Sequence, residues 1–183
     1  MKRIIGLVGM PGAGKSIIAK VAKELGVPVV VMGDVVREEA ASRGIKPTPE
    51  NLGRLMIALR EAEGPGVIAR RCFPKIDSYE NPAVLIDGIR SLAEVEEYKK
   101  RYGKVVILAV HASPKTRFER LKRRGRADDP KDWKTFRERD MRELKVGVGN
   151  VIALADYMLI NEDSKEELKE RARKLLKRLI KND

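Results

Sequence analysis

A short stretch near the start of the chain combines glycines, a lysine and a serine at the spacing of a phosphate-binding loop. It follows the pattern G-x-x-x-x-G-K-S and consists of Gly9, Met10, Pro11, Gly12, Ala13, Gly14, Lys15 and Ser16. Glycines let backbone N–H groups turn inward and approach phosphates closely. In this pattern the lysine reaches the β- and γ-phosphates, and the serine hydroxyl ligates Mg²⁺. The stretch therefore predicts binding of ATP, or another nucleoside triphosphate, together with Mg²⁺.

The segments on either side of the loop fit that interpretation. The apolar run from Ile4 to Val8 is typical of a buried strand, and apolar residues recur at helical spacing between Ile17 and Leu25. A strand before the loop and a helix after it form the context that the motif requires. A helix beginning near Lys15 aims the positive end of its dipole at the phosphates.

Two later strand candidates lead to an aspartate that is followed, three residues on, by an arginine. Asp34 and Arg37 follow the second candidate, and Asp87 and Arg90 follow the third. Asp87 comes after four apolar residues, as in a Walker-B strand, and is the predicted holder of Mg²⁺ or its water. The guanidinium forks of Arg37 and Arg90 match the geometry of a phosphate, so we expect both to bind the acceptor.

Positive charge gathers in the second half of the chain. Between Lys99 and Lys145 there are 17 Lys and Arg residues against 7 Asp and Glu. Mobile arginines stabilise the charge that spreads over the oxygens of a phosphoryl group during transfer. A short basic lid, predicted at about residues 120–130, would exclude water as it closes. The candidate catalytic arginines of the lid and the following helix are Arg120, Arg126 and Arg137.

Together these motifs resemble the adenylate kinase and nucleoside monophosphate kinase family. The resemblance rests on the phosphate-binding loop, on Gly33-Asp34-x-x-Arg37, on Asp87-Gly88-Ile89-Arg90, and on Gly125-Arg126-x-Asp128-Asp129 with Arg137. The stretch Ala155–Asn161, followed by a charged helix, also resembles dephospho-CoA kinases. The chain as a whole is most similar to an archaeal group of dephospho-CoA-kinase-like P-loop proteins.

The resemblance implies roles for individual residues. Lys15 and Ser16 would bind the phosphates and Mg²⁺, and Arg37 and Arg90 would hold an acceptor phosphate. A helical segment at about residues 34–76 would bind the acceptor, and the loop after Ile160 would touch the nucleotide base. The lid and the following helix would act through Arg120, Arg126 and Arg137.

The acceptor can be of two chemical kinds. A phosphate acceptor, such as a nucleoside monophosphate, is already an anionic nucleophile and needs only arginine clamps, so the pair Arg37 and Arg90 favours it. A hydroxyl acceptor, such as dephospho-CoA or a nucleoside, needs a general base. Asp34 is the best-placed carboxylate, and it is therefore a candidate for both catalysis and substrate binding.

The elements that must position these residues can be predicted from hydrophobic periodicity. Five short apolar strands alternate with helices, which predicts an α/β fold with a doubly wound, five-stranded parallel sheet in a single P-loop kinase-like domain of residues 1–183. Ligands of such sheets bind beyond the carboxyl ends of the strands. The predicted strands are Arg3–Val8, Val27–Met32, Ala83–Asp87, Val105–Val110 and Tyr157–Ile160. The predicted helices are Lys15–Leu25, Val35–Arg43, Pro49–Glu63, Ser91–Tyr102, Pro114–Arg124, Lys131–Lys145 and Lys165–Lys181, and Gly147–Asn150 is expected to be a flexible loop.

Composition narrows the class of protein. The net charge of +12 attracts anions such as nucleotides, acidic metabolites or nucleic acid. Cys72 is the single cysteine, which excludes a disulfide framework and a cysteine-based zinc site. No stretch approaches the roughly 18 apolar residues of a membrane-spanning helix. We expect a soluble, cytoplasmic protein whose partner is a small-molecule phosphate acceptor.

The basic surface leaves a second function open, an adenylate-kinase-like NTPase that acts as an RNA or ribosome-assembly factor. Aromatic residues make up only 4% of the chain, too few for base-stacking platforms, and no RNA-binding signature occurs. Nucleic-acid binding is therefore possible and not favoured. A nucleotide-bound regulator without chemistry is the least consistent with intact Lys15, Ser16 and Asp87.

Overall fold

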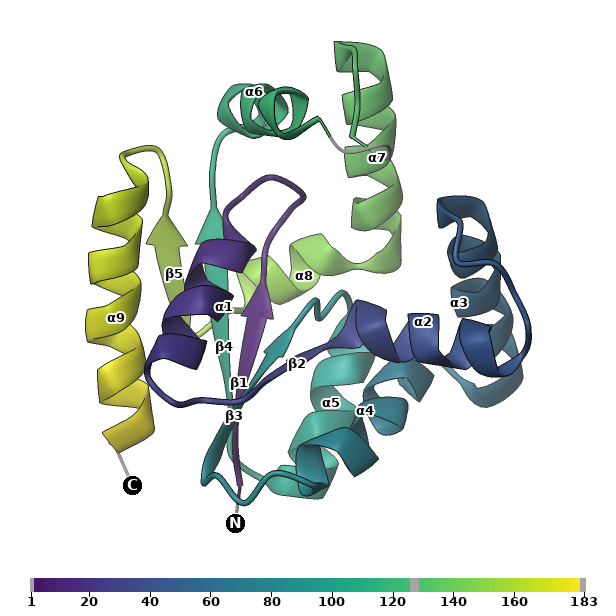
Figure 1. Ribbon diagram of the computed structural model, residues 1–183, viewed down its shortest axis with the longest axis horizontal. Coiled ribbons are helices and arrows are strands. Elements are labelled where there is room, and N and C mark those ends of the chain that lie inside the picture. Colours follow the sequence, from purple (N-terminus) through teal and green to yellow (C-terminus); the bar gives the residue numbers. More distant parts are fainter. Residues whose placement is uncertain (1, 126–128, 182–183) are drawn as a thin grey trace.

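The centre of the protein is a five-stranded sheet in which every strand runs in the same direction. The computed structural model describes residues 2–125 and 129–181. Neighbouring strands follow the order β2-β3-β1-β4-β5, and all four pairings are parallel (Figure 1). This arrangement confirms the predicted fold class. The strands are β1 (Arg3–Val8), β2 (Val29–Val31), β3 (Ala83–Asp87), β4 (Val105–His111) and β5 (Tyr157–Ile160).

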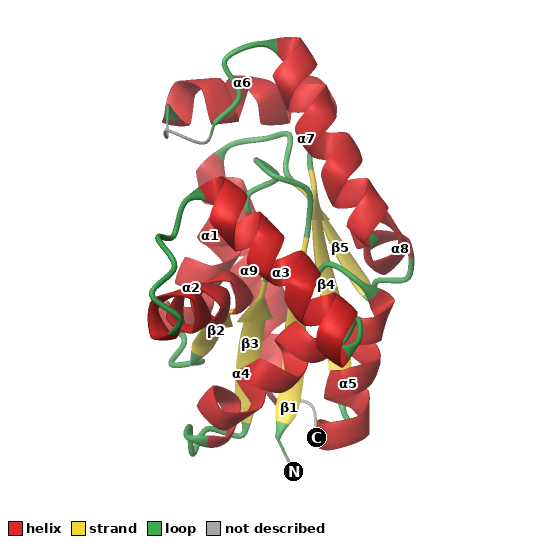
Figure 2. Ribbon diagram, turned by 90° about the vertical axis from the view of Figure 1, so that its right-hand side faces the viewer, coloured by secondary structure: helices red, strands yellow, loops and turns green. Residues whose placement is uncertain are grey.

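Helices cover both faces of the sheet. One face packs against α1 and α9, and the other against α2 to α5 and α8 (Figures 1 and 2). The remaining helices, α6 and α7, lie beyond the carboxyl ends of β1 and β4. The helices are α1 (Lys15–Glu24), α2 (Met32–Ser42), α3 (Pro49–Glu63), α4 (Val67–Asp77), α5 (Leu92–Tyr102), α6 (Pro114–Arg124), α7 (Trp133–Val146), α8 (Val148–Ala153) and α9 (Lys165–Lys181).

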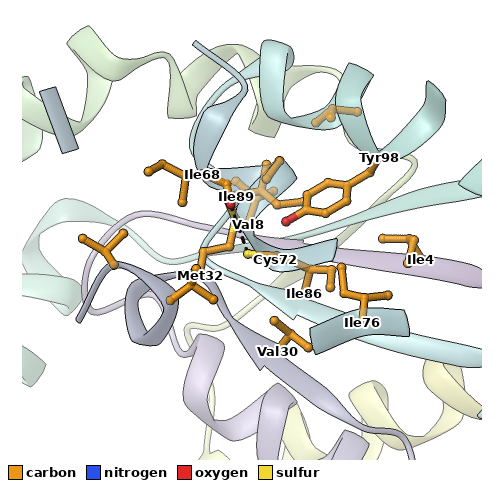
Figure 3. Packing of buried hydrophobic residues seen from close by; sticks show 14 of the residues in the cluster. Ile4, Val8, Val30, Met32, Ile68, Cys72, Ile76, Ile86, Ile89 and Tyr98 are labelled. Carbon is orange, nitrogen blue, oxygen red and sulfur yellow. Dashed lines mark hydrogen bonds between the residues drawn. The ribbon is translucent and has the colours of Figure 1, made fainter. Parts of the chain in front are cut away.

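The central strands are buried on both faces, which explains why they read as unbroken apolar runs. In β1, Ile5 and Leu7 pack toward α1 and α9, while Ile4 and Val8 pack toward the opposite layer. In that opposite layer Cys72 lies fully buried, with its thiol donating to the carbonyl of Ile68 at 3.2 Å (Figure 3). Burial raises the pKa of this thiol to about 11, so Cys72 serves as a core residue.

Residue types at three helix starts explain why these helices begin where they do. Pro114 occupies the first turn of α6, where its missing N–H costs nothing. At the start of α5, Ser91 and Glu94 form a reciprocal capping box. At the start of α9, the Ser164 hydroxyl accepts from the Glu167 N–H at 3.2 Å, and the Glu167 carboxylate accepts from the Ser164 N–H at 3.0 Å.

Two local predictions were wrong. The second strand is shorter than Val27–Met32, because the Val27 N–H closes α1 on the Ala22 carbonyl and α2 already begins at Met32. The stretch Gly147–Asn150 is not a flexible loop, because Val148 buries its side chain within α8. Within the segment of about residues 34–76, which the sequence predicted to be helical without giving this helix its own bounds, α4 forms as a separate helix.

None of the helices within the described ranges combines the length and the apolarity needed to cross a bilayer.

Replacing Ile86 with alanine tests the sheet core. Ile86 is fully buried in β3, and removing most of its side chain should lower the free energy of unfolding by about 2–5 kcal/mol. The matched control is Ile57→Ala in α3, where the side chain is 58% exposed and the loss should be within about 0.5 kcal/mol. Denaturant unfolding followed by circular dichroism measures both. Equal losses in the two variants would contradict the assignment of this core.

Candidate functional site

The phosphate-binding loop lies where the fold predicts a ligand. It connects the end of β1 at Val8 to the start of α1 at Lys15, at the carboxyl edge of the sheet. The strand and the helix that the motif requires are therefore both present. Because α1 begins at the end of the loop, its first N–H groups and its positive dipole end face the space where phosphates would lie.

Lys15 is folded back into the loop. Its Nζ donates to the carbonyl of Gly9 at 2.6 Å and contacts that of Met10 at 3.4 Å. Burial lowers the pKa of the amine, and the nearby charges of Asp87 and Glu143 oppose that shift. The ammonium is thus held in a water-poor place by weak neutral partners, which favours exchange of those carbonyls for phosphate oxygens.

Asp87 ends β3 directly beside the loop. It pairs in register with Leu7 of β1 and with Val31 of β2. Its Oδ1 atom is buried and has no hydrogen-bond partner among the described residues. Burial raises the pKa of this carboxyl, while the charge of Lys15 acts in the opposite sense.

These residues fit a magnesium ion. Mg²⁺ takes hard oxygen ligands and commonly uses one or two protein groups together with substrate phosphates and water. The Ser16 hydroxyl and the orphaned Asp87 carboxylate are two such oxygens next to the loop. The described part of the chain contains no group of three or more metal-ligating side chains, so the phosphates of the nucleotide would complete the site.

The residues predicted to bind the acceptor, here called the acceptor side, follow β2 and β3. Asp34 lies in the first turn of α2 rather than directly at the end of a strand, and its carboxylate is ion-paired with Arg37. Both side chains are half-exposed. The charge of Asp34 also acts on Asp87 and contributes to its raised pKa, which puts Asp34 within electrostatic reach of the loop.

Arg90 lies between α3 and α7 and contacts both helices. Its Nε atom lies 3.5 Å from a carboxylate oxygen of Glu143 in α7, and its Nη1 lies 4.0 Å from the sulfur of Met56 in α3. The charges of Arg90 and Glu143 both act on Lys15. Arg90 therefore lies within electrostatic reach of the loop, and it already has a carboxylate neighbour.

The predicted lid arginines lie in different places. Arg120 of α6 faces the loop, where its Nη2 contacts the Asn161 side-chain oxygen at 3.4 Å and its Nη1 is buried without a partner among the described residues. Arg126 lies outside the described residues. Arg137 is exposed on the outward face of α7 and is not brought to the loop. The inward face instead carries Arg139, whose charge acts on Lys15 and which lies 3.6 Å from Asp129.

Sequence reasoning missed a buried ion pair behind the loop. Arg117 makes two hydrogen bonds to the Asp140 carboxylate, at 2.9 and 2.6 Å, and both side chains are almost completely buried. Asn161, also buried, was missed as well. Arg117 lies in a run of basic residues that reads as a solvated helix face. Acidic residues at Asp140 and Glu143, three apart on a basic helix, were the signal that could have indicated an inward face.

The cationic side chains of the acceptor segment mainly hold its helices together. Arg60 pairs with Glu94 at 3.0 Å, linking α3 to α5, and Arg70 pairs with Glu97 at 3.1 Å, linking α4 to α5. Arg71 of α4 pairs with carboxylates of α2 and α3 at 2.6 Å. These pairs fix the helices of residues 34–76 as a unit beside the loop.

The raised pKa of Asp87 predicts a specific pH dependence of stability. The folded protein binds the Asp87 proton more tightly than the unfolded chain does, so Asp87 should contribute more stability as the pH falls through its raised value toward the ordinary 3.8. The melting temperature of the native protein minus that of Asp87→Asn should therefore increase as the pH is lowered from neutral toward the ordinary carboxyl pKa of 3.8. Taking the difference cancels the other carboxyls. If this difference in melting temperature stayed constant or decreased as the pH was lowered, the result would contradict the desolvation of Asp87.

Comparison with known proteins agrees with this geometry. Residues 8–137 match the model of the AAA domain family. A UPF0200 protein from Hyperthermus butylicus is 58% identical over 176 residues, covering 96% of this chain and 94% of the relative. Among solved structures, shikimate kinase from Bacteroides thetaiotaomicron has a TM-score of 0.63 at 18% identity, covering 96% of this chain and 98% of that one. A gluconokinase from Sinorhizobium meliloti has a TM-score of 0.55 at 18% identity, with coverages of 99% and 94%. The fold is thus that of P-loop kinases, and the chain belongs to the UPF0200 family of archaeal P-loop proteins.

Proposed function

We propose that this protein is an ATP-dependent phosphotransferase that moves the γ-phosphoryl group of ATP, bound with Mg²⁺, to a small acceptor. The observation that carries the proposal is the clustering of Lys15 and Asp87 at the loop with Asp34 and Arg90 on the acceptor side. Phosphoryl transfer is catalysed mainly by positioning and by electrostatic stabilisation, which such a cluster can supply. The kinase-like fold supports the same reaction class.

On the donor side, Lys15 would exchange the Gly9 and Met10 carbonyls for oxygens of the β- and γ-phosphates. Ser16 and Asp87 would hold Mg²⁺, which neutralises charge on those oxygens when bound. Arg120 and Arg139 reach toward the loop and are placed to stabilise the charge on the transferring group. Arg126 keeps its predicted role in the lid, whereas Arg137 would need a movement of α7 to take part.

On the acceptor side, the carboxylates favour a hydroxyl group as nucleophile. Arg37 is already paired with Asp34, and Arg90 lies beside Glu143. The positive charge of each guanidinium is therefore already offset by a carboxylate, which weakens its attraction for an acceptor phosphate. As general base, Asp34 would take the hydroxyl proton while the oxygen attacks the γ-phosphorus and the bond to the ADP oxygen breaks. Dephospho-CoA and nucleosides are acceptors of this kind. Nucleoside monophosphates are the second candidate class, since Arg37 and Arg90 could exchange their partners for a phosphate.

The surface of α7 supports one alternative function. Its outward face lines a shallow hollow of about 460 Å³ and carries an excess of cations. A basic helix face suits the backbone of RNA, so a role as an NTP-dependent RNA or ribosome-assembly factor is the alternative. The lining residues are Lys134, Arg137, Glu138, Met141, Arg142 and Lys145.

A screen of acceptors tests the proposal. ADP release from ATP and Mg²⁺ should be strongly stimulated by one member of a panel of nucleoside monophosphates, nucleosides and dephospho-CoA, with the phosphorylated product identified by mass spectrometry. Lys15→Ala should abolish the turnover, because the phosphates lose their principal cation. Stimulation by structured RNA alone, steeply weakened by salt, would replace the kinase proposal with the alternative.

Kinetics of two acceptor-side variants distinguish the two kinds of acceptor. If the acceptor reacts through a hydroxyl, Asp34→Asn should lower kcat by about 10²–10⁴ with little change in the KM for ATP. If it reacts through a phosphate, Arg90→Ala should chiefly raise the acceptor KM or lower kcat, and Asp34→Asn should have the smaller effect.

The control is Glu24→Gln, which removes a surface carboxylate at the far end of α1 that pairs with Arg173. It should leave all constants unchanged. An effect of Arg90→Ala on ATP binding alone would mean that the acceptor site lies elsewhere.

A further inference from the structure

Two buried side chains hold the phosphate-binding loop from behind. Arg117 Nη1 donates to the carbonyl of Pro11 at 3.1 Å, and Asn161 Nδ2 donates to the carbonyl of Ala13 at 2.8 Å. The two residues are only 4% and 2% exposed. Arg117 comes from α6 and Asn161 directly follows β5, so two separate elements converge on alternate residues of the loop.

Each of these contacts fixes the orientation of a peptide plane. The described residues contain no cis peptide bond, so the C=O and the N–H of each plane point in opposite directions. With the Pro11 carbonyl held toward Arg117, the Gly12 N–H points away from α6. With the Ala13 carbonyl held toward Asn161, the Gly14 N–H points away from β5. The loop and turn hydrogen bonds between backbone groups of residues 2–125 and 129–181 include none donated by Gly12 or Gly14.

The same contacts require glycine at both positions. Gly12 and Gly14 have positive φ values of 81° and 114°. A Cβ atom on Gly12 would lie 2.9 Å from the backbone oxygen of Arg117, and one on Gly14 would lie 2.3 Å from Asn161 Nδ2. The close approach of Arg117 and Asn161 therefore depends on Gly14, which the loop motif specifies, and on Gly12, which occupies one of its variable positions.

Arg117 and Asn161 are themselves rigidly held. The Arg117 guanidinium is bound by both oxygens of Asp140, donates from Nε to the Ala112 carbonyl at 3.2 Å, and lies 4.9 Å from the ring centre of Phe136. The Asn161 N–H donates to the His111 carbonyl at 2.7 Å. Because these partners belong to the strand edge and to α7, the loop is tied to the framework on both sides.

We propose that Arg117 and Asn161 are positioning residues of the nucleotide site, which orient the N–H groups of Gly12 and Gly14 toward the bound phosphates. The proposal rests on the proposed binding of a nucleotide by this loop. Both residues act through the loop backbone. They favour an anionic ligand, because each turns a loop N–H group without a backbone acceptor away from the framework before the ligand arrives.

Apolar replacement separates positioning from stability. The double variant Arg117→Met/Asp140→Leu removes the donor to Pro11 without leaving a buried charge, and such replacements commonly preserve stability. Asn161→Leu removes the donor to Ala13 at nearly constant volume. The control, Arg101→Met/Asp77→Leu, removes an ion pair near Lys2, at the opposite end of β1 from the loop.

Three measurements are made on each full-length protein. They are the melting temperature, the Kd for ADP by calorimetry well below that temperature, and the amide chemical shifts and exchange rates of Gly12 and Gly14 by NMR without nucleotide. The Arg117 and Asn161 variants should keep a cooperative transition, bind ADP about tenfold more weakly or worse, and shift the two glycine amides. The control should leave the Kd and both amides unchanged.

Native ADP affinity and unchanged glycine amides in Asn161→Leu and in the double variant would overturn the proposal. If the double variant does not fold, the Kd for ADP and the glycine amide signals of Asn161→Leu and of the isosteric Asn161→Asp test the proposal instead. Failure of the native protein to bind ADP would refute the proposed function instead. In that case the glycine amides still show whether Arg117 and Asn161 orient the loop.

Discussion

The organising constraint of this structure is the placement of two opposite charges, Lys15 and Asp87, in a crevice with little water. A parallel sheet makes this possible, because β1 and β3 end at the same edge and the register sets Asp87 beside Leu7. Burial lowers the pKa of Lys15 and raises the pKa of Asp87, so it favours the neutral form of each, and their mutual attraction opposes both shifts. Neither charge is fully compensated by the protein. A polyphosphate with its metal ion, as proposed, would supply both missing partners, and the site would be complementary to that ligand before it binds.

Helix α7 connects the donor and acceptor sides of this crevice. Asp140 fixes Arg117 and, through it, the Pro11 carbonyl of the loop, while Glu143 on the same face lies beside Arg90. Residues three apart on one helix face are neighbours, so a single rigid element contacts both the phosphate-binding loop, through Arg117, and Arg90. An inward Arg117–Asp140 pair contributes little net stability if it merely replaces apolar packing. Its value here lies in fixing where α7 and the loop stand relative to each other.

The sequence was sufficient wherever function is encoded in neighbouring residues. The phosphate-binding loop and the strand that ends at Asp87 are local patterns with local physical causes, and each was placed correctly. It was insufficient where the partner is distant. Arg117 and Pro11 are separated by 106 positions, and no periodicity reveals their contact. The sequence indicated Arg137, which faces outward, and did not indicate the inward Arg139, because both faces of α7 are rich in charge and only tertiary packing distinguishes them. The glycines at 147 and 149 suggested a loop, but burial of Val148 and Val151 outweighed them.

The positively charged residues of this protein serve two purposes. Several cations of the acceptor segment are used in ion pairs between helices, a device that suits proteins of organisms that grow at high temperature. The remaining excess acts at long range, where it draws anionic ligands toward the crevice. Close to the loop, carboxylates lie among these cations, since Asp87 lies beside Lys15, Asp34 pairs with Arg37, and Glu143 lies beside Arg90. The proposed hydroxyl acceptor, if anionic overall, would be attracted by the cations and would present its hydroxyl to one of these carboxylates. A doubly charged phosphate acting as nucleophile would instead have to displace the carboxylates from Arg37 and Arg90, so the proposed hydroxyl acceptor would disturb fewer ion pairs.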